Sequence, residues 1–188
     1  MEKETEQQLI ISIQKDPHQF ATLFDTYYLP IFSYVFRRIG DYETAKDVVS
    51  ETFLKAFLNI GKFQWKGISI SFWLYRIANN EIQQCFRKKK YTPDSLDLMV
   101  ETTGWDIIDP ISTLENKLQM EKELKLDEDF TFFQREIKKL PTAYQEVLAL
   151  KYFEQKSIKE IATIVNKKEG TVKSLLSRGI DKLRSSIG

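Results

Sequence analysis

The 188-residue sequence has very little of the chemistry on which most enzyme and metal sites depend. It contains one cysteine, Cys85, and one histidine, His18. A single cysteine excludes an intrachain disulfide and a thiolate metal cage, and a single histidine gives little support to histidine-based catalysis. We therefore expect no metal site, no catalytic residues and no enzymatic activity.

Glycine-rich phosphate loops and long apolar runs are also missing from the sequence. Neither a Gly-x-x-x-x-Gly-Lys nor a Gly-x-Gly-x-x-Gly pattern occurs, so no cofactor is expected. The N-terminus, Met1 to Glu4, is charged and no apolar signal core follows it. No run of about 18 apolar residues could span a membrane. The sequence predicts a soluble, cytoplasmic protein without membrane insertion.

What the sequence does have is the composition of a folded protein and an uneven distribution of charge. Hydrophobic residues make up 42% and aromatic residues 13% of the chain, which favours folded domains. The net charge of +1 conceals three zones. Residues 1–91 carry 13 Lys/Arg against 10 Asp/Glu, residues 92–135 carry 4 against 11, and residues 136–188 carry 11 against 6. Two basic modules flank an acidic connector, and an extended basic footprint suits a partner rich in phosphates.

Turn and breaker signals mark the connector. They are Thr92-Pro93-Asp94, Thr102-Thr103-Gly104 and Asp109-Pro110. We therefore expect a first domain at residues 1–91, an acidic linker at residues 92–126 and a second domain at residues 127–188.

Helical periodicity runs through both modules and predicts an all-α fold of two small helical domains. Asp16-Pro17 begins a helix that continues to Gly40 and that Pro30 should kink or divide. Asp41 caps a second helix, which keeps strict helical spacing of its apolar residues up to Gly61. Further helices are expected at residues 72–90, 112–125 and 127–140.

Residues 140–188 have the pattern of a helix-turn-helix preceded by its own packing helix. Ser157-Ile158-Lys159-Glu160 has the form of a capping box, a polar turn follows at residues 166–168, and a second apolar stripe begins at Val172. The opposite face of this last helix carries groups suited to phosphate contacts and base edges, namely Thr171, Ser174, Arg178 and Lys182. An ordinary amphipathic surface helix would look similar, but the length of the two helices favours binding in a DNA major groove.

Two helix faces in the first module are further candidates for function. The helix after Asp41 has a face that is acidic at one end and apolar at the other, formed by Asp47, Ser50, Glu51, Leu54 and Leu58. It suits a partner helix, and a solvated face is an equal alternative. The helix at residues 72–90 mixes Trp73 with Arg, Asn and Gln, which suits unstacked bases. Taken alone, a core tryptophan with a solvated basic end is the slightly better interpretation.

The order of these parts resembles the alternative sigma factors of bacterial RNA polymerase, in the extracytoplasmic-function (ECF) group of the sigma-70 family. The run from Asp47 to Phe57 (DVVSETFLKAF) is similar to the family's polymerase-clamp-binding helix. The run from Phe72 to Asn80 (FWLYRIANN), followed by Arg87-Lys88, is similar to its promoter-melting helix for the −10 element. Leu140-Pro141, residues 160–162 and residues 170–174 resemble the domain that reads the −35 element.

The resemblance implies a non-enzymatic function in which core RNA polymerase is bound, delivered to a promoter and helped to open the duplex. The implied domains are a sigma region 2-like bundle and a sigma region 4-like helix-turn-helix domain. The implied partners are core RNA polymerase, through its β′ clamp and β flap, promoter DNA and, as a further candidate, an anti-sigma factor. The loop at residues 62–71 would capture an extruded base, and the acidic connector would thread polymerase channels.

The resemblance also assigns residues to each implied surface. The polymerase-binding set is Asp47, Ser50, Glu51, Phe53, Leu54 and Leu58. The set for the −10 DNA is Lys62, Phe63, Trp65, Trp73, Arg76, Asn79, Asn80, Gln84, Arg87 and Lys88. The set for the −35 DNA is Lys168, Thr171, Lys173, Ser174, Arg178 and Lys182.

Several positions depart from the family pattern. Ser50 stands where glutamine is usual, Gln84 where aspartate is frequent, and Leu175, Gly179 and Ile180 replace residues that are usually Arg, Ala and a charged or polar side chain. Promoter sequence is therefore not carried over from relatives. Two other functions stay open at this point: a free-standing regulator that binds duplex DNA as a dimer, and an anti-regulator or scaffold that resembles a sigma factor.

Overall fold

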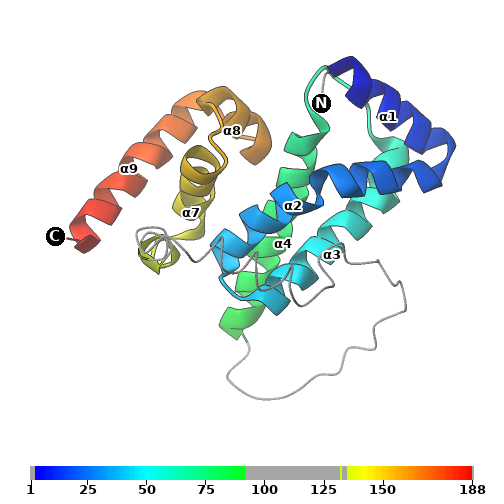
Figure 1. Ribbon diagram of the computed structural model, residues 1–188. Coiled ribbons are helices and arrows are strands. Elements are labelled where there is room, and N and C mark those ends of the chain that lie inside the picture. Colours follow the sequence, from blue (N-terminus) through cyan, green and yellow to red (C-terminus); the bar gives the residue numbers. More distant parts are fainter. Residues whose placement is uncertain (1–2, 92–131, 133–134, 188) are drawn as a thin grey trace.

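The computed structural model describes residues 3–91, 132 and 135–187, and every regular element within these residues is helical (Figure 1). The helices form an N-terminal bundle and a C-terminal bundle, which confirms the expected all-α class with two helical domains. The helix predicted at residues 112–125 lies outside the described residues, as does half of the one predicted at residues 127–140. None of the described helices is long and apolar enough to cross a membrane.

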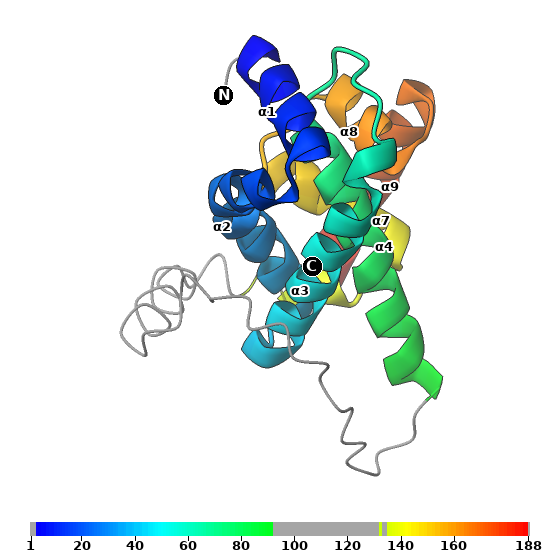
Figure 2. The ribbon, with the colours of Figure 1, turned by 90° about the vertical axis from the view of Figure 1, so that its right-hand side faces the viewer.

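The N-terminal bundle consists of four α-helices and two short 3-10 turns. In chain order these are α1 (Lys3–Lys15), η1 (Pro17–Gln19), α2 (Phe20–Ile39), α3 (Tyr42–Asn59), η2 (Ile60–Lys62) and α4 (Ile70–Tyr91). Helix α2 packs on α3 and α4, while α1 lies against η1 and η2 (Figures 1 and 2). The sequence analysis did not predict α1.

Capping residues explain where α2 and α3 end and begin. Gly40 adopts a left-handed φ of 74° and its N–H donates to Phe36 O at 2.7 Å, which closes α2. The Asp41 carboxylate then accepts a hydrogen bond from Thr44 N at 2.9 Å and starts α3. Both boundaries agree with the sequence prediction.

Pro30 was expected to kink or divide this helix, and α2 is not divided there. The helix runs as one element from Phe20 to Ile39 with Pro30 inside it. Tyr28, Ile31 and Phe32 on either side of the proline are all buried in the core. We infer that their packing outweighs the roughly 3 kcal/mol that an internal proline costs a helix.

The C-terminal bundle contains the predicted helix-turn-helix. Its elements are α7 (Thr142–Leu148), which continues as the π-helical segment η3 (Ala149–Phe153), then α8 (Ile158–Val165) and α9 (Glu169–Ile187). Both hydrogen bonds of the capping box are formed: Ser157 N donates to Glu160 Oε2 at 2.8 Å and Glu160 N donates to Ser157 Oγ at 3.3 Å. Asn166, at a left-handed φ of 53°, ends α8.

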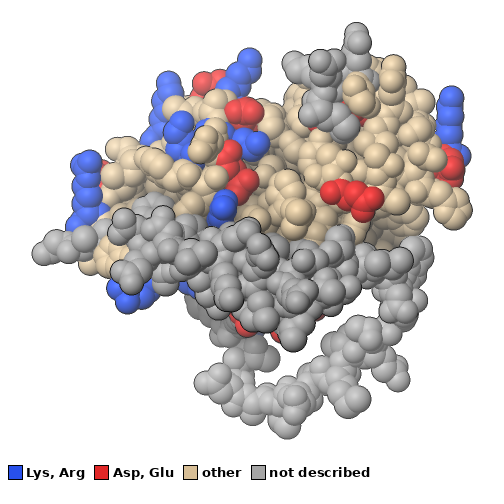
Figure 3. All heavy atoms as spheres, viewed as in Figure 1, with Lys and Arg blue, Asp and Glu red and all other residues tan. Residues whose placement is uncertain are grey.

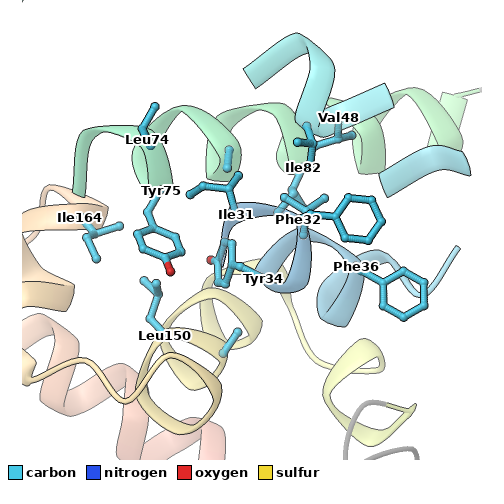
Figure 4. Packing of buried hydrophobic residues seen from close by; sticks show 14 of the residues in the cluster. Ile31, Phe32, Tyr34, Phe36, Val48, Leu74, Tyr75, Ile82, Leu150 and Ile164 are labelled. Atoms are coloured by element: carbon cyan, nitrogen blue, oxygen red, sulfur yellow. The ribbon is translucent and has the colours of Figure 1, made fainter. Parts of the chain in front are cut away.

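The two bundles share one hydrophobic core. Tyr75 of α4 packs edge-on against Tyr34 of α2, with ring centroids 5.1 Å apart. Figure 4 shows these tyrosines facing Leu150 and Ile164 of the C-terminal bundle, and all four side chains are buried. The two bundles are therefore packed against each other, with α8 lying against α4, and we call this arrangement the closed protein.

Candidate nucleic-acid and partner surfaces

Helix α3 presents a mixed acidic and apolar stripe to solvent. Asp47 and Glu51 are exposed, and Leu54 and Leu58 keep 37% and 66% of their surface accessible. These positions follow one another at intervals of three or four residues and so line one side of the helix. Helix α3 packs on α2 and α4, and α4 in turn packs on α8 (Figure 2).

Two details refine this stripe. Partial burial, followed by repulsion from Glu43, raises the pKa of the Asp47 carboxyl above its usual range. Ser50 is half-buried, and Phe53 is only 1% exposed because its ring packs in the core against Phe24 at 4.9 Å. This corrects the expectation that Phe53 contacts a partner directly: its position in the structure is that of a core residue.

A loop between η2 and α4 forms a shallow hollow of about 370 Å³ with the start of α4. The hollow is lined by Asn59, Lys62, Phe63, Gln64, Lys66 and Trp73. The rings of Phe63 and Trp73 lie 4.9 Å apart at an angle of 48°. The structure thus brings together Lys62, Phe63 and Trp73 of the predicted −10 set, and the half-buried Trp65 packs against the same core.

The combination of rings and cations in this hollow is suited to a flat, electron-rich ligand close to a phosphate. Aromatic faces hold unstacked bases, and lysines attract the backbone that carries them. Trp73 is half-buried and packs against the core, as the alternative interpretation supposed, but part of its surface also lines the hollow. Gly67, at a φ of 70°, supplies the turn that brings the loop back to α4.

Further along α4, the predicted −10 residues have different environments. Asn80, Arg87 and Lys88 are exposed, whereas Gln84 is half-buried and donates from Nε2 to Glu81 Oε1 at 3.2 Å. Arg76 donates from Nε to Ile164 O at 3.1 Å and from Nη2 to Thr163 O. These carbonyls lie in the last turn of α8, where the helix dipole favours a cation. Arg76 is therefore engaged by the C-terminal bundle.

Asn79 also belongs to a buried polar cluster and not to an open DNA-binding face. It is 2% exposed, and its Oδ1 accepts a hydrogen bond from Tyr34 Oη at 2.6 Å and another from Arg38 Nη1. This corrects the expectation of a free amide at the surface. Arg38 is 1% exposed, and the buried Glu146 of α7 lies close enough to interact with it electrostatically.

Glu154 forms a second electrostatic contact between the bundles. Its Oε1 accepts a hydrogen bond from Arg37 Nη1 at 3.2 Å, and its Oε2 accepts one from Tyr75 Oη at 2.7 Å. Burial, reinforced by the charge and hydrogen bond of Glu154, raises the pKa of the Tyr75 hydroxyl, which stays protonated and donates. Lys156 adds a cation over the ring of Tyr75, 5.4 Å from its centroid.

In contrast, the predicted −35 residues on and just before α9 are all open to solvent. Lys168, Thr171, Lys173, Ser174, Arg178 and Lys182 are each exposed, while Val172, Leu176 and Leu183 on the other side of the helix are buried. Figure 3 shows Lys and Arg side chains gathered over α8 and α9. The arrangement is that of a recognition helix with its apolar side held and its polar side available.

Sequence reasoning missed the residues that join the bundles, chiefly Arg37, Tyr75 and Glu154. The bonded pair Arg37 and Glu154 is 117 positions apart, and no periodicity or motif relates residues at that separation. A buried arginine such as Arg38 was equally hidden, because arginine is rarely buried unless it is paired. Among the described residues no group of three or more His, Cys, Asp or Glu side chains could hold a metal ion.

Comparisons with known proteins agree with this division into two parts. The family model for Sigma-70 region 2 matches residues 23–92, and the model for Sigma-70, region 4 matches residues 133–183. The ECF RNA polymerase sigma factor SigW of Bacillus subtilis is 34% identical over 174 residues, which cover 92% of this chain and 90% of SigW. The RNA polymerase sigma-H factor of Pseudomonas aeruginosa is 30% identical over 186 residues, covering 98% of this chain and 95% of that protein.

Two solved structures share the fold. CnrH, solved in complex with the cytosolic domain of CnrY, superposes with a TM-score of 0.66 at 17% identity, covering 97% of this chain and 96% of CnrH. The sigma factor RpoE of Bartonella quintana, solved with the anti-sigma factor NepR, gives a TM-score of 0.59 at 19% identity, covering 88% and 94%. At these identities the similarity establishes the helical architecture alone.

Proposed function

This chain belongs to the sigma-70 family, as an ECF-type alternative sigma factor in transcription initiation, and we propose how its own residues divide that function among three surfaces. The observation that carries the proposal is the presence, on one chain, of two separate nucleic-acid elements and a third face free for a protein. These are the hollow at Phe63 and Trp73, the exposed face of α9, and the stripe on α3. In this proposal the chemistry of RNA synthesis belongs to the polymerase, and the chain itself is not an enzyme.

We assign the α3 stripe to core RNA polymerase. Asp47 and Glu51 offer two carboxylates, and Leu54 and Leu58 offer solvent-exposed apolar surface. Burying exposed leucine surface contributes about 25 cal/mol per Å², and neighbouring charges give orientation. The stripe is exposed in this structure, so polymerase could bind it while the two bundles remain packed together. The polymerase clamp is the surface that the family resemblance implies.

We assign the hollow beside Trp73 to a base that is extruded from the melted −10 element. Phe63 and Trp73 provide the rings for stacking, and Lys62 and Lys66 provide charge for the adjoining phosphates. Asn80, Arg87 and Lys88 continue an exposed polar track along α4. Unstacking a base costs a few kcal/mol, and these contacts would offset that cost.

Arg76 can join this track only after it leaves α8. Its guanidinium is occupied by the carbonyls of Thr163 and Ile164, so DNA contact and closure exclude each other. Closure is also incompatible with simultaneous reading of two elements some 25 base pairs apart, which is roughly 85 Å of duplex. A compact chain of this length has a radius of gyration of only about 16 Å. We propose that the bundles separate when the promoter is engaged.

We assign the exposed face of α9 to the −35 element as duplex. Lys173 and Arg178 are placed for phosphates, and Thr171 and Ser174 for base edges, as in other helix-turn-helix proteins. An anti-sigma factor is a candidate third partner, because the related RpoE structure contains one. Since the function is exercised on RNA polymerase, we propose that the protein acts in the cytoplasm.

Affinity capture with purified core polymerase, followed by run-off transcription, tests the polymerase assignment. The variant Asp47→Ala/Glu51→Ala/Leu54→Ala should remain folded by circular dichroism and should bind core polymerase at least about tenfold more weakly. The matched control Ile11→Ala/Asp25→Ala removes an exposed apolar group and an exposed acid from other helices of the same bundle. It should bind normally.

Wild-type binding by the folded triple variant would show that the α3 stripe is not the polymerase surface. A free-standing regulator would behave differently again. It would bind promoter duplex tightly as a dimer without polymerase, and added core polymerase would give no specific transcript.

A further inference from the structure

Helix α1, which no sequence pattern pointed to, is hydrogen-bonded to both ends of the loop that forms the hollow. At one end, Gln14 Nε2 donates to Ile60 O at 3.0 Å and to Phe63 O at 2.8 Å. At the other end, the buried carboxylate of Glu6 reaches Ser69 and Ile70. Helix α1 therefore bridges the two points at which the loop leaves η2 and enters α4.

The Glu6 carboxylate is a well-satisfied anchor. It accepts from Tyr27 Oη at 2.6 Å, from Ser69 Oγ at 2.8 Å and from Ile70 N, the first amide of α4, at 3.2 Å. Glu6 is only 3% exposed, and hydrogen bonds to a carboxylate in such a setting are among the stronger ones. Burial, together with the Glu6 hydrogen bond, raises the pKa of Tyr27, so its hydroxyl stays protonated and continues to donate.

The Gln14 amide is a different kind of contact because it is exposed and contributes little to the core. Its two hydrogen bonds hold the backbone on either side of Lys62, and Phe63 in turn packs on Trp73. Moving the Phe63 carbonyl would therefore change the distance between the two rings of the hollow.

We propose that Gln14 and Glu6 are positioning residues that fix the relative placement of the Phe63 and Trp73 rings, which line the hollow, and through it the capture of an extruded promoter base and the choice among bases. The proposal rests on the function assigned above to that hollow. Gln14 holds the backbone of Phe63. Glu6 holds the first residue of α4, the helix that carries Trp73. Neither side chain itself touches DNA in this proposal.

A graded series at Gln14 tests this inference in the full-length holoenzyme. Gln14→Ala removes both donors, and the isosteric Gln14→Glu replaces them with a carboxylate that repels the carbonyls of Ile60 and Phe63. Gln8→Ala and Gln8→Glu are the matched controls, because Gln8 is an exposed glutamine of the same helix and the second variant carries the same new charge. Thermal unfolding of all four variants should stay close to that of the wild type, since both positions are exposed.

The measurements are promoter opening and base choice. Opening is followed by permanganate reactivity and by 2-aminopurine fluorescence at the extruded position of a promoter that the wild-type holoenzyme opens. Base choice is the ratio of affinities for four single-stranded −10 oligonucleotides that differ only at that position. We expect Gln14→Ala to slow promoter opening about threefold and Gln14→Glu about tenfold. The affinities for the four oligonucleotides should also differ less than in the wild type, and least in Gln14→Glu. Polymerase binding and −35 duplex binding should not change.

Four results separate the possibilities. Opening rates and base ratios like those of the wild type in both Gln14 variants would overturn the inference, as would equal effects of Gln14→Glu and Gln8→Glu. A wild-type holoenzyme that shows no preference among the four oligonucleotides would instead contradict the function assigned to the hollow. Slower opening with unchanged base preference would also count against a role of Gln14 in placing the rings that line the hollow.

Discussion

Helices α4 and α9 carry similar polar side chains but use them in opposite ways. On α4, Arg76 is hydrogen-bonded to carbonyls of α8 and Asn79 is buried beside Arg38. On α9, all of the predicted DNA-contacting residues are exposed. One candidate DNA-binding face is thus partly covered by the rest of the chain, and the other is open in the same conformation.

The difference shows that a polar helix face cannot be taken as a free binding face from its composition. The α4 face has two functions in our interpretation, because it closes the protein first and contacts the melted strand later. The α9 face has one. Substitutions on α4 should therefore alter both the closed protein and the open promoter complex, while substitutions on α9 should alter DNA binding alone.

The largest expected effect comes from Arg76→Ala and Asn80→Ala on α4. Both variants should keep polymerase binding but lose strand opening by up to about a hundredfold, since contacts to an unstacked base are worth about 1 to 3 kcal/mol. Permanganate reactivity of unpaired thymines measures this step. Only Arg76→Ala should also expand the free protein in small-angle X-ray scattering, because only Arg76 contacts α8.

A pre-melted promoter bubble provides the control for this pair, because it removes the cost of opening and should restore transcription. If both variants open duplex promoters at the wild-type rate, the polar track of α4 is an ordinary solvated surface. Equal scattering profiles for the two variants would show that the Arg76 contact does not hold the bundles together.

Next in size is a loss of folding stability from Tyr34→Phe. The change removes the buried hydroxyl that donates to Asn79 and accepts from the charged Arg38, so two hydrogen bonds of the cluster are lost while the one from Arg38 to Asn79 remains. We expect the free energy of unfolding to fall by about 1 to 3 kcal/mol. Urea denaturation provides the measurement, and Tyr152→Phe, at an exposed tyrosine, serves as the control. A loss as small as that of the control would mean that the covered polar cluster contributes nothing to the fold.

A smaller effect is expected on α9, where Lys173→Ala and Arg178→Ala should weaken −35 duplex binding without changing stability. Each contact with one phosphate contributes about 0.9 to the slope of log K against log salt. Each variant should therefore lower that slope by about one unit, and sequence preference should hardly change. Titrations across a range of salt concentrations measure the slope. Wild-type slopes for both variants would place these side chains away from the DNA backbone.

The smallest effect concerns Glu146, the carboxyl that faces Arg38 across the interface, with Lys167 also nearby. Burial raises the pKa of Glu146 despite these two cations. A raised pKa in the folded state means that the protonated form is favoured there. The stability contributed by the protonated Glu146 carboxyl is fully present below the unfolded pKa of about 4.3 and is lost as the pH rises through the folded pKa.

Glu146→Gln should remove the pH dependence that Glu146 gives to the free energy of unfolding. The difference in unfolding free energy between the variant and the wild type should grow in favour of the variant from about pH 4.3 upward and then level off. Urea titrations at several pH values would reveal it. A difference that is independent of pH would show that Glu146 does not titrate within the interface.

Much of the local structure could be predicted from the sequence, and particular residues show why. The capping box at Ser157, the cap at Asp41 and the stop at Gly40 depend on neighbours within one helical turn, and all three are observed. Pro30 does not divide α2, because core packing on both sides of the proline outweighs a local rule. Helix α1 was missed because its role depends on the distant loop that Glu6 and Gln14 hold.

The candidate surfaces divide in the same way. The residues of the α3 stripe and of the α9 face could be predicted because helical spacing alone places them on one side. Phe53 and Asn79 could not be placed correctly, because aromatic and amide side chains occur both in cores and at surfaces. The geometry of the hollow, with Phe63 against Trp73, required a loop conformation that no periodic pattern specifies.

By itself, the sequence determined most of the helical segments, α1 excepted, where most of them begin and end, and which residues could meet DNA or polymerase. These properties depend on interactions over a few residues, and such interactions can be read from spacing and side-chain type. Only the tertiary structure decided which of those residues are available. Arg76 and Ile164 are 88 positions apart, and Arg37 and Glu154 are 117 apart. Contacts at such separations arise from the packing of whole helices in a shared core, and that packing closes one face of this protein and leaves the other open.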